Sequence, residues 1–308
     1  MRCPSLNELP SPPPNKTGWP WTEETSAASA RMPNGNPWPK ISIVTPSYNQ
    51  GQFLEETIRS VLLQGYPNLE YIIMDGGSSD SSVEIIHKYE PWLAYWVSEK
   101  DAGQAAAINN GFARATGSVF GWINSDDYYE RNALAIAGRY FKNPNESFIL
   151  LGAGNVVDEF GAVIERRCPT KVDRKLLVEW RLKWRDHWFM QQSCFWPAAV
   201  WRACGGVEER FELLFDYDLW FKFLRHAYFR CTDDVFASMR YYANTKTMML
   251  RNRSQGEFAL VYARHGEYDA LFEMVIDVSL ANVQLTQELN KIKGRIFYRV
   301  LRRLGWRP

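Results

Sequence analysis

The stretch ISIVTPSYNQGQFLEETIRSVLLQGYPNLEYIIMDGG, residues 41–77, decides the fold. It opens with a short β-branched run, residues 41–45, which ends at Pro46 and predicts a buried strand. Apolar residues then recur with a helical period from residue 52 to 64. A second apolar run, residues 69–74, predicts another strand. The order strand, helix, strand indicates parallel strands that are joined by a helical crossover.

The alternation of strand and helix continues to residue 123. We expect further strands over residues 93–97 and 118–123, and helices from about 80 to 89 and from 104 to 115. In a parallel sheet of this kind, ligands bind outside the carboxyl ends of the strands. Polar residues that follow each strand should therefore converge on one site. They occupy residues 45–49, 75–80, 99–104 and 124–127.

Beyond residue 131 the pattern is less regular. Helices are expected over three segments and short strands over two, with a hairpin near Glu159-Phe160-Gly161. The helical segments are residues 131–141, 173–183 and 216–226, and the strand-like ones are residues 148–151 and 193–196. Residues 254–290 predict one or two amphipathic helices.

Composition divides the chain into three parts. Residues 1–39 predict a flexible or extended arm, because nine of the sixteen prolines lie there and no hydrophobic period is present. Its three tryptophans, Trp19, Trp21 and Trp38, would pin parts of the arm to the body. Residues 40–250 form the main domain. Residues 251–308 form a helical extension that ends in a basic tail.

Charge and cysteine content exclude several classes of protein. The chain has 36 Lys and Arg against 35 Asp and Glu, and this net charge of +1 argues against nucleic-acid binding. Five cysteines without a CxxC pair indicate neither a zinc site nor a disulfide framework. No apolar run approaches the roughly 20 residues of a spanning helix, and no signal peptide is recognisable, so we expect a cytoplasmic protein. Aromatic residues make up 15% of the chain, which suits a core or stacking on sugar rings.

The segment Asn124-Ser125-Asp126-Asp127 directly follows a predicted buried strand. Adjacent carboxylates in this position suit Mg²⁺ or Mn²⁺, which prefer oxygen ligands and usually share them with substrate phosphates. The alternative is that Asp127 only caps the helix that begins near Arg131. The residues alone leave both interpretations open.

Two glycine-containing turns and one acidic helix start complete the set of candidates. Asp75-Gly76-Gly77-Ser78 and Asp101-Ala102-Gly103-Gln104 let the backbone approach a ligand closely, or form ordinary capped turns before a helix. In Asp216-Tyr217-Asp218 the carboxylates begin a helix, where the macrodipole favours them. The functional alternative is that one of the two is a general base.

These motifs, in this order, resemble those of the family 2 glycosyltransferases, which have the GT-A fold. The resemblance covers roughly residues 40–250. It rests on ISIVTPSYN (41–49), SVLLQ with YPN (60–68), DGGSSD (75–80), SEKDAGQ (98–104), AINNG (107–111), WINSDD (122–127) and FDYDLW (215–220).

The resemblance implies an α/β fold with a doubly wound, mostly parallel sheet flanked by helices, and with the helical C-terminal extension outside it. Residues 40–130 would form the nucleotide-sugar half and residues 131–250 the acceptor half. The activity would be an inverting, metal-dependent transfer of a sugar from a nucleotide-diphosphate sugar to a hydroxyl of a glycan or lipid-linked acceptor. Such an activity would belong to polysaccharide biosynthesis in the cell envelope, with UDP as one candidate carrier.

The resemblance also assigns roles to single residues. Thr45, Pro46 and Tyr48 would frame the nucleotide base, and Asp75 would contact it. The nucleotide-sugar pocket would be lined by Gly77, Asp101, Gln104, Asn109, Asn124 and Asp126. Asp126 and Asp127 would hold Mn²⁺ or Mg²⁺. Asp216 would be the catalytic base, with Asp218 as the second choice.

Two departures from the family pattern stand out. Asn124 occupies a position where the family often has Asp, which lowers the negative charge of the site. The segment Arg240–Asn244 lacks the His that members often carry, although Lys246 follows and would meet a phosphate. Two other hypotheses remain. A nucleotidyltransferase would usually carry a basic glycine-rich loop, which Thr45–Gly51 is not, and a carbohydrate-binding protein would not need Asp126, Asp127 and Asp216.

Two further segments have open interpretations. Trp180, Trp184 and Trp188 recur every four residues, which is typical of a core-facing helix and alternatively of an acceptor groove. The basic tail, residues 291–308, contains seven Lys and Arg and no acid. It predicts peripheral contact with the inner face of a membrane, or a solvated end.

Overall fold

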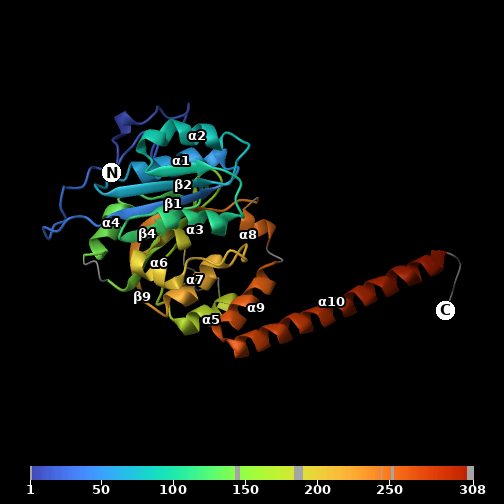
Figure 1. The fold of residues 1–308 in the computed structure, drawn as a ribbon. Coiled ribbons are helices and arrows are strands. Elements are labelled where there is room, and N and C mark those ends of the chain that lie inside the picture. Colours follow the sequence, from blue (N-terminus) through green and yellow to red (C-terminus); the bar gives the residue numbers. More distant parts are fainter. Residues whose placement is uncertain (1, 143–145, 184–189, 244, 251–252, 304–308) are drawn as a thin grey trace. The chain divides into compact units, whose positions relative to one another are not determined.

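A computed structural model describes residues 2–142, 146–183, 190–243, 245–250 and 253–303. The chain separates into two compact units, residues 1–254 and 255–308. The first unit contains the sheet and every candidate site residue (Figure 1). Trp184, Trp188 and Arg307 lie outside the described residues, as do the side chains of residues 294–303, so the tryptophan stripe and most of the basic tail stay as predictions.

The first half of the sheet is parallel, as the sequence predicts. Its strands lie in the order β3-β2-β1-β4, and Ile41 of β1 lies between Leu69 of β2 and Val119 of β4. The four strands are β1 (Ile41–Ser47), β2 (Leu69–Asp75), β3 (Tyr95–Ser98) and β4 (Val119–Trp122). The crossovers are α1 (Gly51–Leu62), α2 (Ser82–Tyr89) and α3 (Gln104–Arg114). Helices α1 and α2 cover one face of the sheet and α3 the other, so β1, β2 and β4 are buried, while β3 at the end of the sheet is half-buried (Figure 1).

The second half makes the sheet mixed. Strand β8 pairs antiparallel with both β4 and β6, while β6 and β9 run parallel to each other. The remaining strands are β5 (Tyr128–Tyr129), β6 (Phe148–Val157), β7 (Val163–Arg167), β8 (Cys194–Pro197) and β9 (Tyr228–Arg240). The helices are α4 (Ala133–Tyr140), α5 (Arg174–Lys183), α6 (Ala198–Cys204), α7 (Phe215–Phe223) and α8 (Lys246–Met249). The hairpin near Gly161 is confirmed, because β6 and β7 pair across it.

The sequence analysis did not predict β9, although it is the longest strand. Its sequence, YFRCTDDVFASMR, contains four charged residues among apolar ones without strict alternation. The strand is stabilised by pairing with β6 and β5, which lie far away in the sequence. Because this pairing is non-local, the sequence of the strand has no hydrophobic period that would predict it.

Residues 2–39 have little regular secondary structure, and parts of them pack on the body. They contain one short 3₁₀ turn (Leu6–Glu8), but Trp21 and Trp38 are buried. The buried guanidinium of Arg59 on α1 donates hydrogen bonds to the carbonyl oxygens of Pro10, Pro20 and Trp21. Because the arm has few regular backbone partners, these bonds to one buried cation hold it in place.

The second unit consists mainly of helices α9 (Ser254–His265) and α10 (Tyr268–Arg303), in agreement with the predicted amphipathic helices. Over the described ranges, every helix is too short or too polar to cross a lipid bilayer.

Candidate active site

The ends of β1, β2 and β3 meet at one edge of the sheet. Ser47, Asp75 and Ser98 lie side by side in register, and the Gly76 amide donates to the Ser47 carbonyl at 2.9 Å. The buried Asp75 carboxylate accepts from the Ser78 amide and hydroxyl at 2.8 and 2.6 Å, and from the Ser98 hydroxyl at 2.7 Å. Asp75 therefore shapes the glycine turn from within.

The two glycine turns pass close to each other. A Cβ on Gly76 would lie 3.2 Å from the carboxylate oxygens of Asp101, and one on Gly77 would lie 3.2 Å from the Lys100 amide. Gly77 also has a φ of +80°, which a side chain would strain. These turns therefore place Asp75, Gly77 and Asp101 together at the edge of the sheet, as the sequence predicts.

A chain of amides connects α3 to the acidic pair Asp126-Asp127. Gln104 Nε2 donates to Asn124 Oδ1 at 2.9 Å, and Asn124 Nδ2 donates to Asp127 Oδ2 at 3.2 Å. From the other side, Lys246 Nζ donates to Gln104 Oε1 at 3.2 Å. Asn124 thus links Gln104 to Asp127 through both ends of its amide, which Asp in this position would not do.

Asp127 is held by donors from three elements and is 3% exposed. The Arg240 amide donates to Oδ1 at 2.8 Å, while Gln192 Nε2 and Asn124 Nδ2 donate to Oδ2 at 2.6 and 3.2 Å. Burial, and after it the neighbouring Asp126 charge, raises the pKa of Asp127. Both oxygens of Asp127 therefore already accept hydrogen bonds from within the protein.

Asp126 has a different environment. It is half-buried, and the Tyr242 phenol donates to its Oδ2 at 3.1 Å. Arg240 Nε donates to the Asp126 carbonyl at 3.0 Å, and its guanidinium also pairs with Glu56 at 3.0 Å. Burial raises the pKa of Asp126, and burial together with Asp126 raises that of Tyr242 to about 12. The end of β9 and the segment that follows it therefore orient this carboxylate.

The structure separates the two acids of α7. Asp218 is completely buried and forms an ion pair with Lys222 at 3.0 Å, and Lys222 also donates to the Gly206 carbonyl. Asp216 is half-buried in the first turn, next to Phe215, whose ring lies 5.7 Å from Lys246 Nζ. Since Lys246 also contacts Gln104, the start of α7 lies on the same side as the nucleotide turns. Asp216 is therefore the more exposed of the two acids.

Two predicted ligand residues are used within the protein. The buried Thr45 hydroxyl lies 3.1 Å from the Tyr71 hydroxyl, below the sheet edge. Asn109 donates to the carbonyl of Val207 and accepts from its amide, both at 3.0 Å, and so holds the turn ahead of α7. Both side chains thus have partners within the protein, and their contacts with a nucleotide stay a prediction. Pro46 is buried, while Tyr48 is 63% exposed and free to stack on a flat ring.

Comparison with known proteins decides the family. The family described as Glycosyl transferase family 2 matches residues 42–195, which is half of the chain. The chain belongs to this family. The matched region contains both glycine turns and Asp126-Asp127, and it ends before Asp216.

The curated relatives agree with that assignment. Uncharacterised glycosyltransferases of Rickettsia felis and Rickettsia typhi are 27% and 29% identical over 70% and 61% of this chain. The putative teichuronic acid biosynthesis glycosyltransferase TuaG of Bacillus subtilis is 36% identical over 31% of this chain and 39% of its own length. The chain spans 36% and 59% of the two Rickettsia proteins.

Solved structures confirm the GT-A fold. S. aureus TarS in complex with UDP-GlcNAc has a TM-score of 0.57 at 17% identity, covering 73% of this chain and 65% of that one. The mannosyltransferase PcManGT of Pyrobaculum calidifontis, in complex with GDP-Man and Mn²⁺, has a TM-score of 0.52 at 18% identity. That match covers 87% of this chain and 86% of the other.

The residues of the candidate site fit a divalent cation at one carboxylate. Among the described side chains, no cluster of three or more His, Cys, Asp or Glu forms a complete metal cage. Asp126 is partly accessible and receives the Tyr242 hydrogen bond on one oxygen, which suits a hard cation that shares its remaining ligands with phosphates and water. Asp127, predicted as a second ligand, is occupied by protein donors. We therefore expect Asp126 to be the ligand and Asp127 its support.

The sequence analysis missed the residues that hold this pair, namely Gln192, Arg240 and Tyr242. Gln192 lies in a short 3₁₀ turn (Gln191–Ser193) before β8, and Arg240 ends β9. The sequence analysis reports that Arg240–Asn244 lacks a His. It does not predict that Tyr242, in the same segment, donates a hydrogen bond to Asp126. The adjacent tyrosines Tyr241 and Tyr242 are the feature of the sequence that could have indicated this contact.

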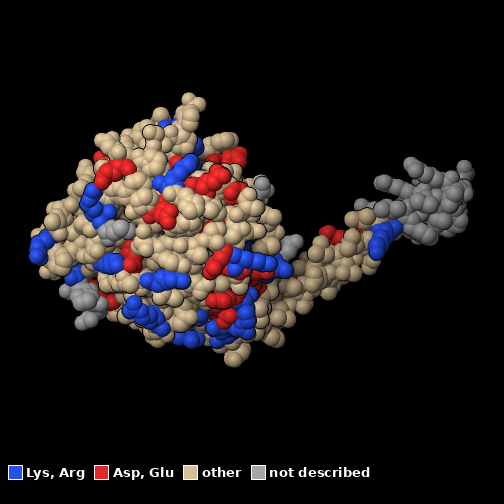
Figure 2. All heavy atoms as spheres, turned by 45° about the horizontal axis from the view of Figure 1, so that its top comes forward, with Lys and Arg blue, Asp and Glu red and all other residues tan. Residues whose placement is uncertain are grey.

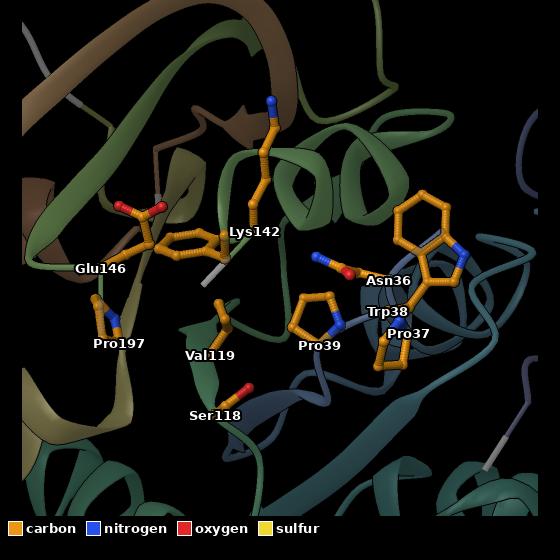
Figure 3. Close-up of a pocket in the computed structure, with 10 residues that line it drawn as sticks. Asn36, Pro37, Trp38, Pro39, Ser118, Val119, Lys142, Glu146 and Pro197 are labelled. Atoms are coloured by element: carbon orange, nitrogen blue, oxygen red, sulfur yellow. The ribbon is translucent and has the colours of Figure 1, made fainter. Parts of the chain in front are cut away.

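A cavity of about 380 Å³ lies away from this site, at the opposite ends of the strands (Figure 3). It is lined by residues just before β1, such as Trp38 and Pro39, and by Val119 at the start of β4. The nucleotide turns follow the other ends of the same strands, so the cavity is separate from the proposed chemistry.

Proposed function

We propose that this protein transfers a sugar from a nucleoside-diphosphate sugar to a hydroxyl of a glycan or lipid-linked acceptor. The observation that carries the proposal is that the glycine turns, Asp126 and Asp216 lie at one edge of a GT-A sheet in a family 2 chain. The donor complexes of TarS and PcManGT support the choice of donor class, and the name of TuaG supports an acceptor of the cell envelope. Family membership favours this activity over a nucleotidyltransferase or a carbohydrate-binding protein.

Each part of the donor has a group that suits it. The base would stack near the exposed Tyr48 and lie against the turn that Asp75 shapes, where Gly76 and Gly77 leave no side chain in the way. Asp101 would face the ribose or the sugar. The diphosphate would lie between Asp126 and the ammonium group of Lys246, which Gln104 already orients. A Mn²⁺ or Mg²⁺ ion held by Asp126 would supply positive charge to the departing diphosphate.

The transfer itself requires one base. The acceptor hydroxyl oxygen forms a bond to the anomeric carbon while the bond from that carbon to the diphosphate oxygen breaks. The hydroxyl proton goes to the Asp216 carboxylate, and the nucleoside diphosphate leaves with the bonding electron pair. Because one base and one leaving-group site suffice for a single displacement, the anomeric configuration would invert.

A donor screen tests the proposal. UDP-, GDP- and dTDP-sugars, each with and without Mn²⁺, should raise the melting temperature of the full chain for at least one donor, and more with the metal, because a ligand that binds only the native state stabilises it. The same donor should then be consumed with release of nucleoside diphosphate. Release of pyrophosphate from a nucleoside triphosphate would instead support a nucleotidyltransferase, and binding without turnover a carbohydrate-binding protein.

We also propose that the basic tail brings the enzyme to the inner face of a membrane, where a lipid-linked acceptor would lie. Replacement of Arg299, Arg302, Arg303 and Arg307 by glutamine should lower the affinity for anionic vesicles by about 10²–10³, measured by co-sedimentation, because each basic residue near such a surface contributes about 1 kcal/mol. Neutral vesicles are the control. Equal binding of both proteins to anionic vesicles would contradict this part of the proposal.

A further inference from the structure

Helix α10 exposes a long apolar surface. It has 36 residues, and its large hydrophobic side chains are exposed along most of the described part. Figure 2 shows this rod as mostly free of charged side chains up to the region near its far end. A helix of this length with exposed aliphatic residues is typical of a segment that pairs with another helix.

The apolar residues follow a heptad. They recur at alternating intervals of three and four, which is the spacing of a left-handed coiled coil. The first set of seam positions is Tyr268, Val275, Asn282 and Leu289, and the second is Leu271, Val278, Leu285 and Ile292. In coiled-coil notation these are the a and d positions. In the sequence the same spacing continues to residue 296.

We propose that two copies of this chain pair their α10 helices in parallel, with this heptad seam as the interface. Asn282 is the one polar residue among the eight seam positions, and a single Asn at an a position sets register and the number of strands at some cost in stability. Next to the seam, Glu288 occupies a g position and Lys293 the following e position. In a parallel pair, Glu288 of one copy faces Lys293 of the other, so the charges are complementary.

The charge of the helix distinguishes this partner from a lipid surface. From Tyr268 to Asn290, α10 carries Asp269, Glu273, Asp277 and Glu288 but no Lys or Arg. Helices that lie on membranes usually present basic residues beside the apolar face. Here three of the four acids lie outside the seam and its flanking positions, where they keep the outer surface of a paired coil soluble.

A second apolar stripe provides the matched control. Phe272, Ile276, Leu280 and Val283 lie outside the a and d positions, and this stripe ends at Val283 while the seam continues. Leu280 is 57% exposed and Leu285 56%. The two leucines therefore differ in their heptad position but not in exposure, residue type or helical setting.

The first experiment compares Leu285→Asp with Leu280→Asp in the full chain by sedimentation equilibrium over a concentration series. The wild-type protein should have about twice the mass of the 35.8 kDa chain. Leu285→Asp should weaken self-association at least tenfold, while Leu280→Asp should resemble wild type. Unchanged thermal unfolding of the main unit would show that both variants fold. A monomeric wild-type protein, or equal effects of the two substitutions, would overturn the proposal.

The second experiment tests whether the two α10 helices are parallel and whether the partner of α10 is a second copy of the chain. In a Cys168→Ser background, which removes the exposed cysteine, Leu285→Cys should form an interchain disulfide on mild oxidation much faster than Leu280→Cys. Glu288→Lys should weaken pairing at low salt, and adding Lys293→Glu should restore it. Absence of the Leu285→Cys crosslink would exclude the parallel register. A monomer that binds anionic vesicles through Leu285 would assign the seam to lipid and also overturn the proposal.

Discussion

Replacing Asp216 with asparagine is expected to lower kcat for sugar transfer by about 10²–10⁴, with donor binding almost unchanged. The substitution keeps the size of the side chain but removes the carboxylate that would accept the proton of the acceptor hydroxyl. Asp216 is the half-buried acid at the start of α7, beside the Lys246 and Gln104 contacts of the nucleotide side. Release of nucleoside diphosphate and the anomeric configuration of the product are the measurements.

Asp218→Asn is the matched control for that experiment. This variant breaks the buried ion pair with Lys222 and should cost about 3–5 kcal/mol of unfolding free energy, because Lys222 is left without its counter-charge. Its activity loss should therefore accompany a lower melting temperature, whereas Asp216→Asn should keep the wild-type value. Near wild-type kcat in a well-folded Asp216→Asn protein would show that another group is the base.

Replacing Asp126 with asparagine is expected to lower kcat/KM by about 10²–10³ and to weaken the dependence on Mn²⁺. The reason is that a bound cation contributes several kcal/mol to stabilising the leaving group, and each 1.36 kcal/mol is a factor of ten. Tyr242→Phe removes only the hydrogen bond to Asp126 Oδ2. Loss of a hydrogen bond that orients a metal ligand lowers metal affinity by about 10- to 100-fold. Tyr242→Phe should therefore have a smaller effect than Asp126→Asn. Titration with Mn²⁺, followed by activity and by calorimetry, measures both.

The variant Asp127→Asn tests whether Asp127 supports the loop or is itself the metal ligand. Asp127 accepts from Arg240, Gln192 and Asn124, so an amide group there would place one N–H₂ against other donors. We expect a lower melting temperature together with loss of donor binding. If Asp127→Asn folded normally and lost Mn²⁺ dependence while Asp126→Asn kept it, the two roles would be reversed.

The nucleotide half of the fold was predictable because its information is local. Each strand and helix from residue 41 to 123 has its own hydrophobic period and its own glycine or proline boundary, and parallel pairing then places the turns at one edge. Asp75, Gly77, Asp101, Gln104 and Asn124 were found in this way. The acidic pair was proposed from its position after a strand, whereas the choice of Asp216 rested on the resemblance to the family 2 glycosyltransferases.

The parts that the sequence did not predict depend on contacts across the chain. The bond from Arg240 to Asp127 spans 113 residues, and Gln192 reaches the same carboxylate across 65. A similar distance in sequence separates Asn109 from the Val207 turn that occupies its amide. No local pattern marks such partners, because they come together only after the sheet has formed.

The amino-acid sequence by itself determined the alternating α/β order, the edge at which the turns converge and the heptad of α10, since all three follow from the spacing of residues along the chain. Only the tertiary structure decided which acid is accessible. Asp126 and Asp127 are neighbours of the same type, as Asp216 and Asp218 nearly are. Donors from distant elements distinguish Asp126 from Asp127, and burial distinguishes Asp218, paired with Lys222, from Asp216.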